Sequence, residues 1–357
     1  MKYSVYSCGS NGNFQLGNKT DIDLNKLSIS YFDEESVLSN RPVKIIGGGN
    51  HTLVLFENGE MYSSGLNEFG QCGYCDELQV KSFRRIPFVN GIKWVNGSCG
   101  WNFSILVNEN NEIYSCGEGL NGELGLGREI RESMKKEKEE KDVSAVRRVD
   151  IDGVLNEKNW RGEVRIKDVK SSLDHTIVML SNNKTVGWGN NKKNQMSLSE
   201  LKEDKVLWEP ALVDMKMLNN GDNGNDNGND NDSEEEMIVT NYSLGRNFSI
   251  IGNKKDKKIR IISKSKTLAF NNNDNLVIED IEFEDIKTMW SSFHLFLNEK
   301  EIVSIGNNRH KQKFPLEDMK NKSGIDIDEF EVGSEHGVIL DKKSNRVYSW
   351  GWGEHGN

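Results

Sequence analysis

The sequence has few of the residues that cross-link a chain or interrupt its strands. It has 357 residues, of which 4 are prolines and 5 are cysteines. An odd number of irregularly spaced cysteines does not suit the disulfide framework of a small secreted protein. No apolar run reaches the ~18 residues of a membrane-spanning helix, and the strand-like Ser4–Ser7 stands where a signal peptide would lie. We therefore expect a soluble, intracellular protein.

The cysteines also give little sign of a metal site. Cys72 and Cys75 have the spacing of half a zinc site, but no second pair or histidine tract accompanies them. Cys8 and Cys116 each stand directly before a glycine that recurs along the chain, which is typical of packing residues at strand ends. We expect no metal and no cofactor in this chain.

Glycine, in contrast, is abundant, and much of it belongs to a repeated turn. The 34 glycines include those of the pattern Gly-x-Asn-x-x-Gly-Gln-Leu-Gly. This turn motif occurs, with varying completeness, at Gly9–Gly17, Gly65–Gly73, Gly117–Gly125, Gly189–Met196, Gly306–Gln312 and Gly351–Asn357.

A second half-motif alternates with the turn motif. It consists of a small-residue turn, then histidine or an aromatic residue, then an apolar strand. It occurs at residues 48–55, 99–106, 172–180, 245–251, 292–297 and 333–340. Short strands between glycine and asparagine turns, repeated about every 50 residues, are typical of β-propeller blades.

We therefore predict an all-β protein with a single seven-bladed propeller domain over residues 1–357. The seventh repeat is counted from the eroded stretch Ile262–Thr267. The last blade is expected to be incomplete, because the sequence stops at Asn357 where further strands should follow. Two insertions interrupt the period: a charged loop at about 128–160, and an Asn, Asp and Gly tract at 218–237 that is expected to be disordered.

Two motifs that suggest an enzyme are better explained by the repeat. Gly117–Gly122 and Gly351–Gly356 fit the dinucleotide-binding pattern Gly-x-Gly-x-x-Gly, but they lie in the frame where Gly9 and Gly65 begin a turn. The histidines likewise occupy what we interpret as one repeated packing position, shared by His51, His175, His294 and His336 and filled elsewhere by Trp101 or Phe248. No nucleophile stands beside a histidine and an acid in a recognisable order, so we expect no enzyme.

The paired half-motifs resemble the repeat of the regulator-of-chromosome-condensation family of seven-bladed propellers, along essentially the whole chain. WD and kelch repeats fit less well, because Trp-Asp never occurs here and the kelch repeat lacks the Gln-Leu-Gly turn. Within that family the sequence is most similar to the fungal alpha-tubulin suppressor proteins. The runs that carry this resemblance include Val5–Gly12, Gly48–His51, Cys99–Trp101, Val186–Gly189, Met289–Leu295, Gly333–Gly337 and Trp350–Asn357.

This resemblance implies a binding protein of the cytoplasm and nucleus. Its partner would be a small metal-binding zinc finger protein of the CSL type, bound as a heterodimer, with Elongator components as further partners. That pathway serves diphthamide biosynthesis and Elongator-dependent modification of wobble uridines in tRNA. The metal would then belong to the partner.

The residues expected to contact the partner lie at blade ends in the runs that carry the resemblance, where tryptophan supplies contact area and polar groups fix the register. They are Trp101, Trp290, His294, Glu335, His336, Trp352, Glu354 and His355. The pairs Glu335–His336 and Glu354–His355 leave a metal site open as an alternative reading.

Two other functions remain open: guanine-nucleotide exchange on a small GTPase, and a microtubule-related scaffold. The exchange factor of this family also binds chromatin, whereas the present net charge of -10 and the absence of a basic N-terminal tail do not favour contact with phosphate backbones. We expect no direct DNA binding and no membrane association.

Overall fold

The computed structural model describes residues 2–129, 145–157, 164–196, 205–213, 239–263, 275–297, 300–321 and 325–354. The chain divides into two compact units, which we describe separately. Unit 1 comprises Met1–Lys192, Glu203–Leu212 and Trp352–Asn357, and unit 2 comprises Lys193–Lys202 and Val213–Gly351.

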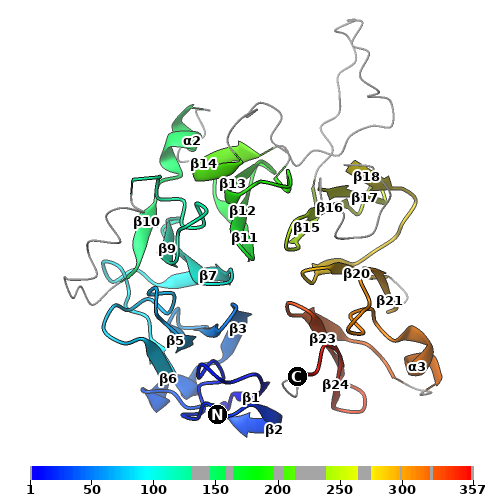
Figure 1. Ribbon diagram of the computed structural model, residues 1–357, viewed down its shortest axis with the longest axis horizontal. Helices are drawn as coiled ribbons and strands as arrows, with labels where there is room; N and C mark the ends of the chain where they lie inside the picture. The colour runs from blue at the N-terminus through cyan, green and yellow to red at the C-terminus, as the bar shows by residue number, and fades with distance from the viewer. Residues whose placement is uncertain are drawn as a thin grey trace, which may run out of the picture. The chain divides into compact units, whose positions relative to one another are not determined.

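Unit 1 contains four antiparallel sheets with their strands in chain order (Figure 1). The first has only two strands, β1 (Tyr6–Gly9) and β2 (Leu24–Ile29). The second contains β3 (Pro42–Gly47), β4 (His51–Phe56), β5 (Met61–Leu66) and β6 (Gln79–Arg85). The third contains β7 (Trp94–Cys99), β8 (Phe103–Asn108), β9 (Ile113–Gly117) and β10 (Arg147–Val149). The fourth contains β11 (Ile166–Ser172), β12 (His175–Leu180), β13 (Thr185–Asn190) and β14 (Val206–Val213). Two short helices, η1 (Glu35–Ser39) and α2 (Asp152–Glu157), lie between strands.

Unit 2 contains three sheets of the same kind. The first contains β15 (Asn241–Leu244), β16 (Ser249–Asn253), β17 (Lys258–Ile262) and β18 (Asn275–Ile278). The second contains β19 (Asp285–Thr288), β20 (Ser292–Phe296) and β21 (Ile302–Gly306), and the third β22 (Glu329–Val332), β23 (His336–Asp341) and β24 (Arg346–Gly351). The short helix α3 (Leu316–Asn321) lies between the last two sheets in sequence.

The all-β prediction holds, but the prediction of seven blades is wrong. In the described ranges six sheets have the three or four strands of a propeller blade, whereas β1 pairs only with β2. A count of turn motifs overestimates the number of blades. The motif marks only the end of one strand, and at Gly9 that strand belongs to a two-stranded sheet.

The predicted insertions fall largely outside the described residues. Residues 218–237 do so entirely. Within the expected charged loop at about 128–160, residues 145–157 contain β10 and α2, whose Val149, Ile151 and Leu155 are buried.

One backbone pairing recurs in the blades and explains the repeated glycines. We call the residue that begins the second strand of a blade the slot residue. It faces the first glycine of the turn motif in the pairs His51–Gly65, Phe103–Gly117, His175–Gly189, Ser292–Gly306 and His336–Gly351. These glycines have φ between 99° and 122°, a range that side-chain-bearing residues rarely adopt. A Cβ on Gly65 would lie 2.4 Å from the carbonyl oxygen of Asn50, and on Gly117 2.3 Å from that of Asn102, so there is no space for one.

The turn motif also ties neighbouring blades together. The Gln71 side chain accepts a hydrogen bond from the Phe69 N–H at 3.0 Å, which fixes the turn. The Gln71 carbonyl in turn accepts one from Ser104 Oγ of the next blade at 2.8 Å. Further along, Trp188 Nε1 donates to the Glu123 carbonyl and Trp350 Nε1 to the Gln312 carbonyl, each at 2.8 Å.

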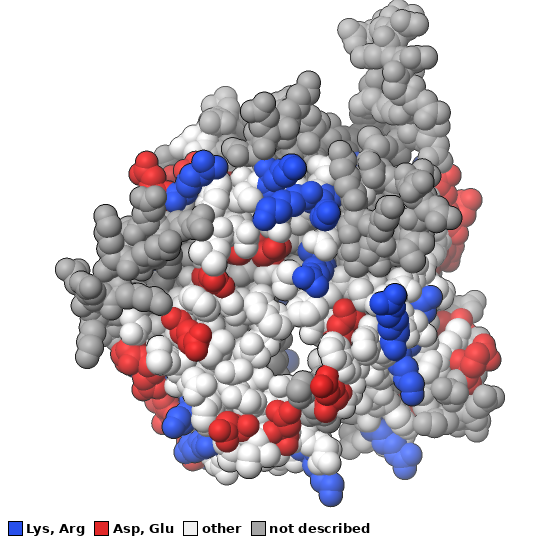
Figure 2. Space-filling view, in the orientation of Figure 1, with Lys and Arg blue, Asp and Glu red and all other residues white. Residues whose placement is uncertain are grey.

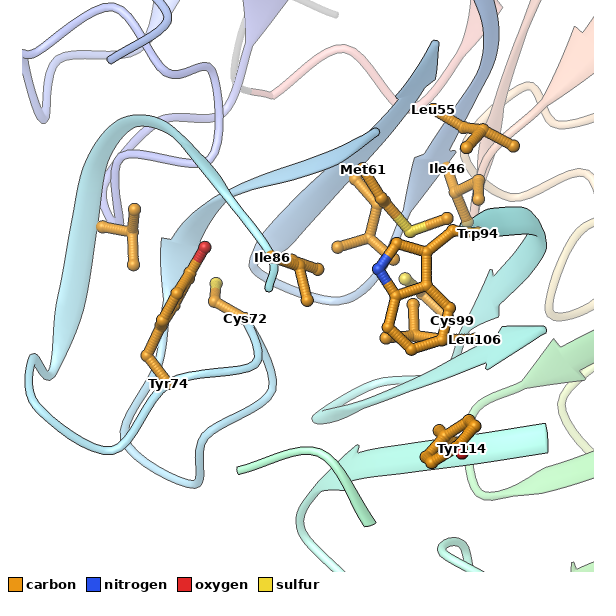
Figure 3. Close-up of a cluster of buried hydrophobic side chains, with 12 residues drawn as sticks. Ile46, Leu55, Met61, Cys72, Tyr74, Ile86, Trp94, Cys99, Leu106 and Tyr114 are labelled. Carbon is orange, nitrogen blue, oxygen red and sulfur yellow. The ribbon is translucent and has the colours of Figure 1, made fainter. Parts of the chain in front are cut away.

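Apolar packing fills the space between the second and third sheets of unit 1. Figure 3 shows Cys72, Tyr74, Trp94, Cys99 and Tyr114 among the side chains of this buried cluster. Burial raises the pKa of the Cys72 thiol well above its usual value, so the thiol stays protonated and acts as a packing group. Cys116 is buried as expected, whereas Cys8, its counterpart in β1, is exposed.

We predict that Gly65→Ala destabilises unit 1 by roughly 2–5 kcal/mol, because the alanine would combine backbone strain with a clash against Asn50. Urea unfolding would measure this loss. Gly12→Ala is the matched control, since a Cβ there meets no atom within 4 Å, and it should change stability little. Equal effects of the two substitutions would contradict the account of the glycine contact.

Glu123 has the same position in the turn motif at Gly117–Gly125 that Gln71 has in the motif at Gly65–Gly73. We predict that this carboxyl makes the free energy of unfolding depend on pH. Burial raises the pKa of Glu123 to about 7, with a smaller contribution from Asp174, while hydrogen bonds from Asn121 oppose the shift. Since the carboxyl pKa is higher in the folded state, its stabilising effect is full below the usual value of 4.5 and is lost as the pH rises towards 7. Glu123→Gln should therefore be more stable than the parent at pH 8, by up to about 3 kcal/mol, and nearly equal to it at pH 4. Denaturant unfolding at both pH values tests this, and a pH-independent difference would contradict it.

Candidate functional site

The loops between the first and second strands of successive blades are linked by backbone hydrogen bonds. In unit 1 the Gly49 N–H donates to the Trp101 carbonyl at 3.0 Å, and the Trp101 N–H to the Leu173 carbonyl at 2.9 Å. We call these three loops the unit 1 loop row. In unit 2 the corresponding bonds run from Arg246 N–H to the Trp290 carbonyl at 3.3 Å and from Trp290 N–H to the Ser334 carbonyl at 2.7 Å. Those loops form the unit 2 loop row.

Of the residues in these bonds, Arg246 lies two positions before Phe248, whose ring packs against Gly245, and the others lie two positions before a slot residue. Their backbone groups bond to the neighbouring blade, while their side chains vary from glycine to tryptophan and arginine. A row of this kind holds variable side chains on a fixed backbone, which is what a specific binding surface requires.

The unit 2 loop row brings together an aromatic ring, a cation and a carboxylate. The exposed Arg246 guanidinium lies over the half-buried Trp290 ring, 5.9 Å from its centroid. In the adjacent position Ser291 Oγ donates to the Glu335 carboxylate, 3.0 Å from each oxygen. The structure therefore brings the predicted residues Trp290 and Glu335 into one row and adds Arg246. The signal that could have identified Arg246 is its position two residues before Phe248.

His336 and His294 make contacts within the fold. His336 is the slot residue of its blade and packs against Gly333, where a Cβ would lie 2.7 Å from the imidazole ring. Burial lowers the pKa of His336 and so favours its neutral form. His294 is fully buried in β20, where Nδ1 lies 2.8 Å from Ser304 Oγ and Nε2 lies 3.3 Å from Ser292 Oγ.

The expected equivalence of His294 with the other histidines does not hold. His294 pairs with Ser304, and the slot position of its blade belongs to Ser292. In the same way Phe103, and not Trp101, is the slot residue of its blade.

In unit 1 the predicted Trp101 is 37% exposed and lies against Gly49, where a Cβ would be 2.6 Å from the indole ring. Carboxylates flank the same row. Glu118 accepts a hydrogen bond from Asn102 Nδ2 at 2.8 Å, and Asp174 accepts one from Asn190 Nδ2 at 2.6 Å. The unit 1 loop row thus combines an exposed tryptophan with amide–carboxylate pairs.

The remaining predicted residues lie at the end of the sequence. Trp352 is 41% exposed and Glu354 is also exposed, and both are grouped with unit 1. His355 lies outside the described residues. The structure thus places the predicted residues in two separate sets, one in each unit.

The two loop rows offer aromatic, cationic and carboxylate side chains. No group of three or more His, Cys, Asp or Glu side chains there could hold a metal ion. Gly117 and Gly122 lie at the end of β9 and in the following turn, without the helix that a dinucleotide site requires. In Figure 2 the coloured residues show basic and acidic side chains in separate small groups over the face in view. Among the residues searched, no helix is long and apolar enough to span a membrane.

Similarity to solved structures identifies the fold of this chain. Human WBSCR16 superposes with a TM-score of 0.72 at 12% identity, covering 99% of this chain and 90% of that protein. Yeast RCC1 (Prp20), solved bound to Kap60, gives 0.57 at 18% identity, with 99% and 67% covered. These likenesses establish an RCC1-like β-propeller fold.

Sequence comparisons point to the same family. Models of the regulator of chromosome condensation (RCC1) repeat match residues 43–71 and 58–107. An RCC1 repeat-containing protein of Schizosaccharomyces pombe is 28% identical over 360 residues, covering 99% of this chain and 88% of the relative. The ultraviolet-B receptor UVR8 of Arabidopsis thaliana is 37% identical over 100 residues, which are 28% of this chain and 23% of that receptor. By these family-model matches and relatives, the chain is similar to RCC1 repeat proteins.

The buried histidines predict a loss of stability in acid. Burial lowers the pKa of both His51 and His294 to about 4 from 6.5. Because each ring is neutral in the folded protein, its contribution is full above pH 6.5 and is lost as the pH falls towards 4. Replacing His294 by Asn should flatten the pH dependence of unfolding between pH 6.5 and 4, and lower stability at pH 7 through the lost packing. An unchanged slope, measured by denaturant unfolding, would contradict a buried neutral imidazole.

Proposed function

We propose that this chain is a non-catalytic, protein-binding propeller. In our proposal it binds and regulates a small metal-binding zinc finger protein of the CSL type, and acts with it in Elongator-dependent modification of tRNA wobble uridines and in diphthamide biosynthesis. The observation that supports a binding role is the unit 2 loop row, where Arg246, Trp290 and Glu335 are held by interactions between blades. Tryptophan and arginine are enriched among the residues that contribute most to binding in protein interfaces.

The surroundings of the Ser–His pairs support a non-catalytic role. His51 Nε2 lies 2.8 Å from Ser104 Oγ, which would suit a nucleophile and its base, but both residues are buried and Ser104 donates to the Gln71 carbonyl. His294 and Ser292 are likewise buried. A hydroxyl enclosed in this way cannot reach a substrate, so these pairs act in packing.

The choice of partner rests on the sequence runs that resemble the alpha-tubulin suppressor proteins, above all Met289–Leu295 and Trp350–Asn357. Met289–Leu295 contains Trp290 of the unit 2 loop row, and the described part of the closing run contains the exposed Trp352 and Glu354. In this proposal the partner keeps its own metal ligands, and the propeller contributes aromatic and charged contacts around them.

Guanine-nucleotide exchange is the second candidate, favoured by one observation. The secretion-regulating guanine nucleotide exchange factor of Bos taurus is 31% identical over 125 residues, which are 34% of this chain and 26% of that protein. A limited match of this kind does not identify a GTPase, so this activity serves as an alternative outcome of the test.

We predict that the purified chain binds the zinc-loaded CSL-type protein of the same organism in isothermal titration calorimetry. Trp290→Ala should weaken binding by about 2 kcal/mol, or roughly 30-fold, because it removes the ring on which Arg246 lies. Glu335→Gln should weaken it less, since the amide can still accept a hydrogen bond from Ser291. Val347→Ala is the control, because Val347 is an exposed apolar residue of the same unit outside the loop row.

Absence of binding by the parent chain, or equal affinities for parent and Trp290→Ala, would contradict the proposal. Faster nucleotide release from a small GTPase, measured in parallel with a fluorescent nucleotide, would favour the second candidate. In cells that lack the chain, wobble-uridine side chains and diphthamide should both fall, as measured by mass spectrometry.

A further inference from the structure

The two loop rows match position by position. Trp101 and Trp290 both lie two residues before the slot residue of their blade, and the N–H of each donates to the loop of the following blade. In that following loop, the residue directly before the slot residue is Asp174 in unit 1 and Glu335 in unit 2. Each row therefore places a tryptophan beside a loop that carries a carboxylate.

The rows differ in the residue that precedes the tryptophan in the row. In unit 2 the Arg246 guanidinium lies over the Trp290 ring, 5.9 Å from its centroid. The matching position in unit 1 is Gly49, which has no side chain. The Trp101 indole lies against Gly49, where a Cβ would be 2.6 Å from the ring, and is 37% exposed. Unit 1 thus has the tryptophan and the carboxylate of this arrangement, and its glycine position cannot supply the cation.

Two carboxylates lie in the segments bonded to the Trp101 loop. The Asn102 side chain donates to one Glu118 carboxylate oxygen at 2.8 Å, and the Glu118 N–H donates to the Asn102 carbonyl at 2.8 Å. Since Asn102 directly follows Trp101, these bonds hold the half-buried Glu118 beside the tryptophan loop. Asp174 adds a second negative charge in the loop to which Trp101 donates. The middle of the unit 1 loop row therefore attracts cations.

All of these groups belong to one compact unit. Trp101 lies in the middle loop of the row, between the loops of Gly49 and Leu173, and its backbone bonds to both neighbours are within unit 1. The strands that lead into the three loops are β3, β7 and β11, and β7 contacts both of the others (Figure 1). The exposed ring is therefore flanked by described blades on both sides.

We propose that the unit 1 loop row binds an arginine-containing segment of another protein. The guanidinium of that segment stacks on the exposed Trp101 ring and pairs with the Glu118 carboxylate, as Arg246 stacks on Trp290 within unit 2. Arginine fits better than lysine, because its planar and weakly hydrated guanidinium both stacks on aromatic rings and donates to carboxylates. The site uses no residue of the unit 2 loop row and needs no zinc finger protein, so it goes beyond the proposed function.

The probe is a fluorescently labelled peptide of sequence Gly-Arg-Gly-Arg-Gly, titrated with the whole chain and followed by anisotropy at low ionic strength. We expect saturable binding in the sub-millimolar range. Trp101→Ala should weaken binding about tenfold, because the stacking surface is lost. Glu118→Gln should weaken it roughly threefold, since the amide still accepts the hydrogen bond from Asn102 but carries no charge. The effect of Glu118→Gln should shrink as salt is added.

Each variant has a matched control in unit 1. Glu109→Gln removes the same charge from an exposed residue in the hairpin after β8, at the far end of that strand from Trp101, and should bind as the parent does. Leu78→Ala removes a 70% exposed apolar side chain outside the row and should also bind as the parent does. A peptide with lysine in place of arginine should bind more weakly, and one with uncharged citrulline should not bind.

No saturable binding to the parent, or equal binding by parent and Trp101→Ala, would overturn the proposal. Equal weakening by Glu109→Gln and Glu118→Gln would show attraction by the overall negative charge and would overturn the site. Equal binding of the lysine peptide would overturn the choice of arginine. The urea midpoint of each variant shows that it is folded, and Glu118→Gln, which keeps its hydrogen bond to Asn102, tests the site if Trp101→Ala is unstable.

Discussion

Five of the six described blades depend on one close contact between a glycine and the backbone opposite it. The carbonyl oxygen of Asn50 lies where a Cβ of Gly65 would be, and the same oxygen accepts a hydrogen bond from the Leu66 N–H at 2.8 Å. Asp174 has the same arrangement with Gly189 and with the Asn190 N–H, at 2.9 Å. Because only glycine permits this approach, it fixes where the third strand ends and the turn begins. The slot residue then needs only to fill space, which explains why histidine, phenylalanine and serine all occur there.

This contact separates structural from variable positions. Glycines, slot residues and turn glutamines serve the fold, while the residues one and two places before the slot project from loops whose backbone bonds are already satisfied between blades. The side chains of Trp101, Arg246 and Trp290 can therefore be replaced without loss of the backbone hydrogen bonds that hold each loop. The same reasoning explains β1, which has the glycine and the turn of a third strand but, among the described strands, pairs only with β2.

Much of the strand pattern could be predicted from the sequence, because glycine spacing and apolar runs are local signals. The runs at 48–55, 99–106 and 172–180 contain most of β4, most of β8 and all of β12. The blade number could not be predicted from turn motifs, since a motif reports one strand end and not the strands that pair with it. The strand register at His294 could not be predicted either. Ser292 is the slot residue of that blade, and His294 lies two residues further along. The stacking of Arg246 on Trp290 joins different blades and leaves no local pattern.

The central claim is that the loop rows are fixed by backbone bonds between blades before any partner binds. Amide hydrogen exchange on the free chain, resolved to single residues, tests it most directly. The account predicts that the N–H groups of Gly49, Trp101 and Trp290 exchange as slowly as strand amides of β8 and β20, because each donates to a neighbouring loop. Exchange of these amides at the rate of an unbonded surface loop would contradict it.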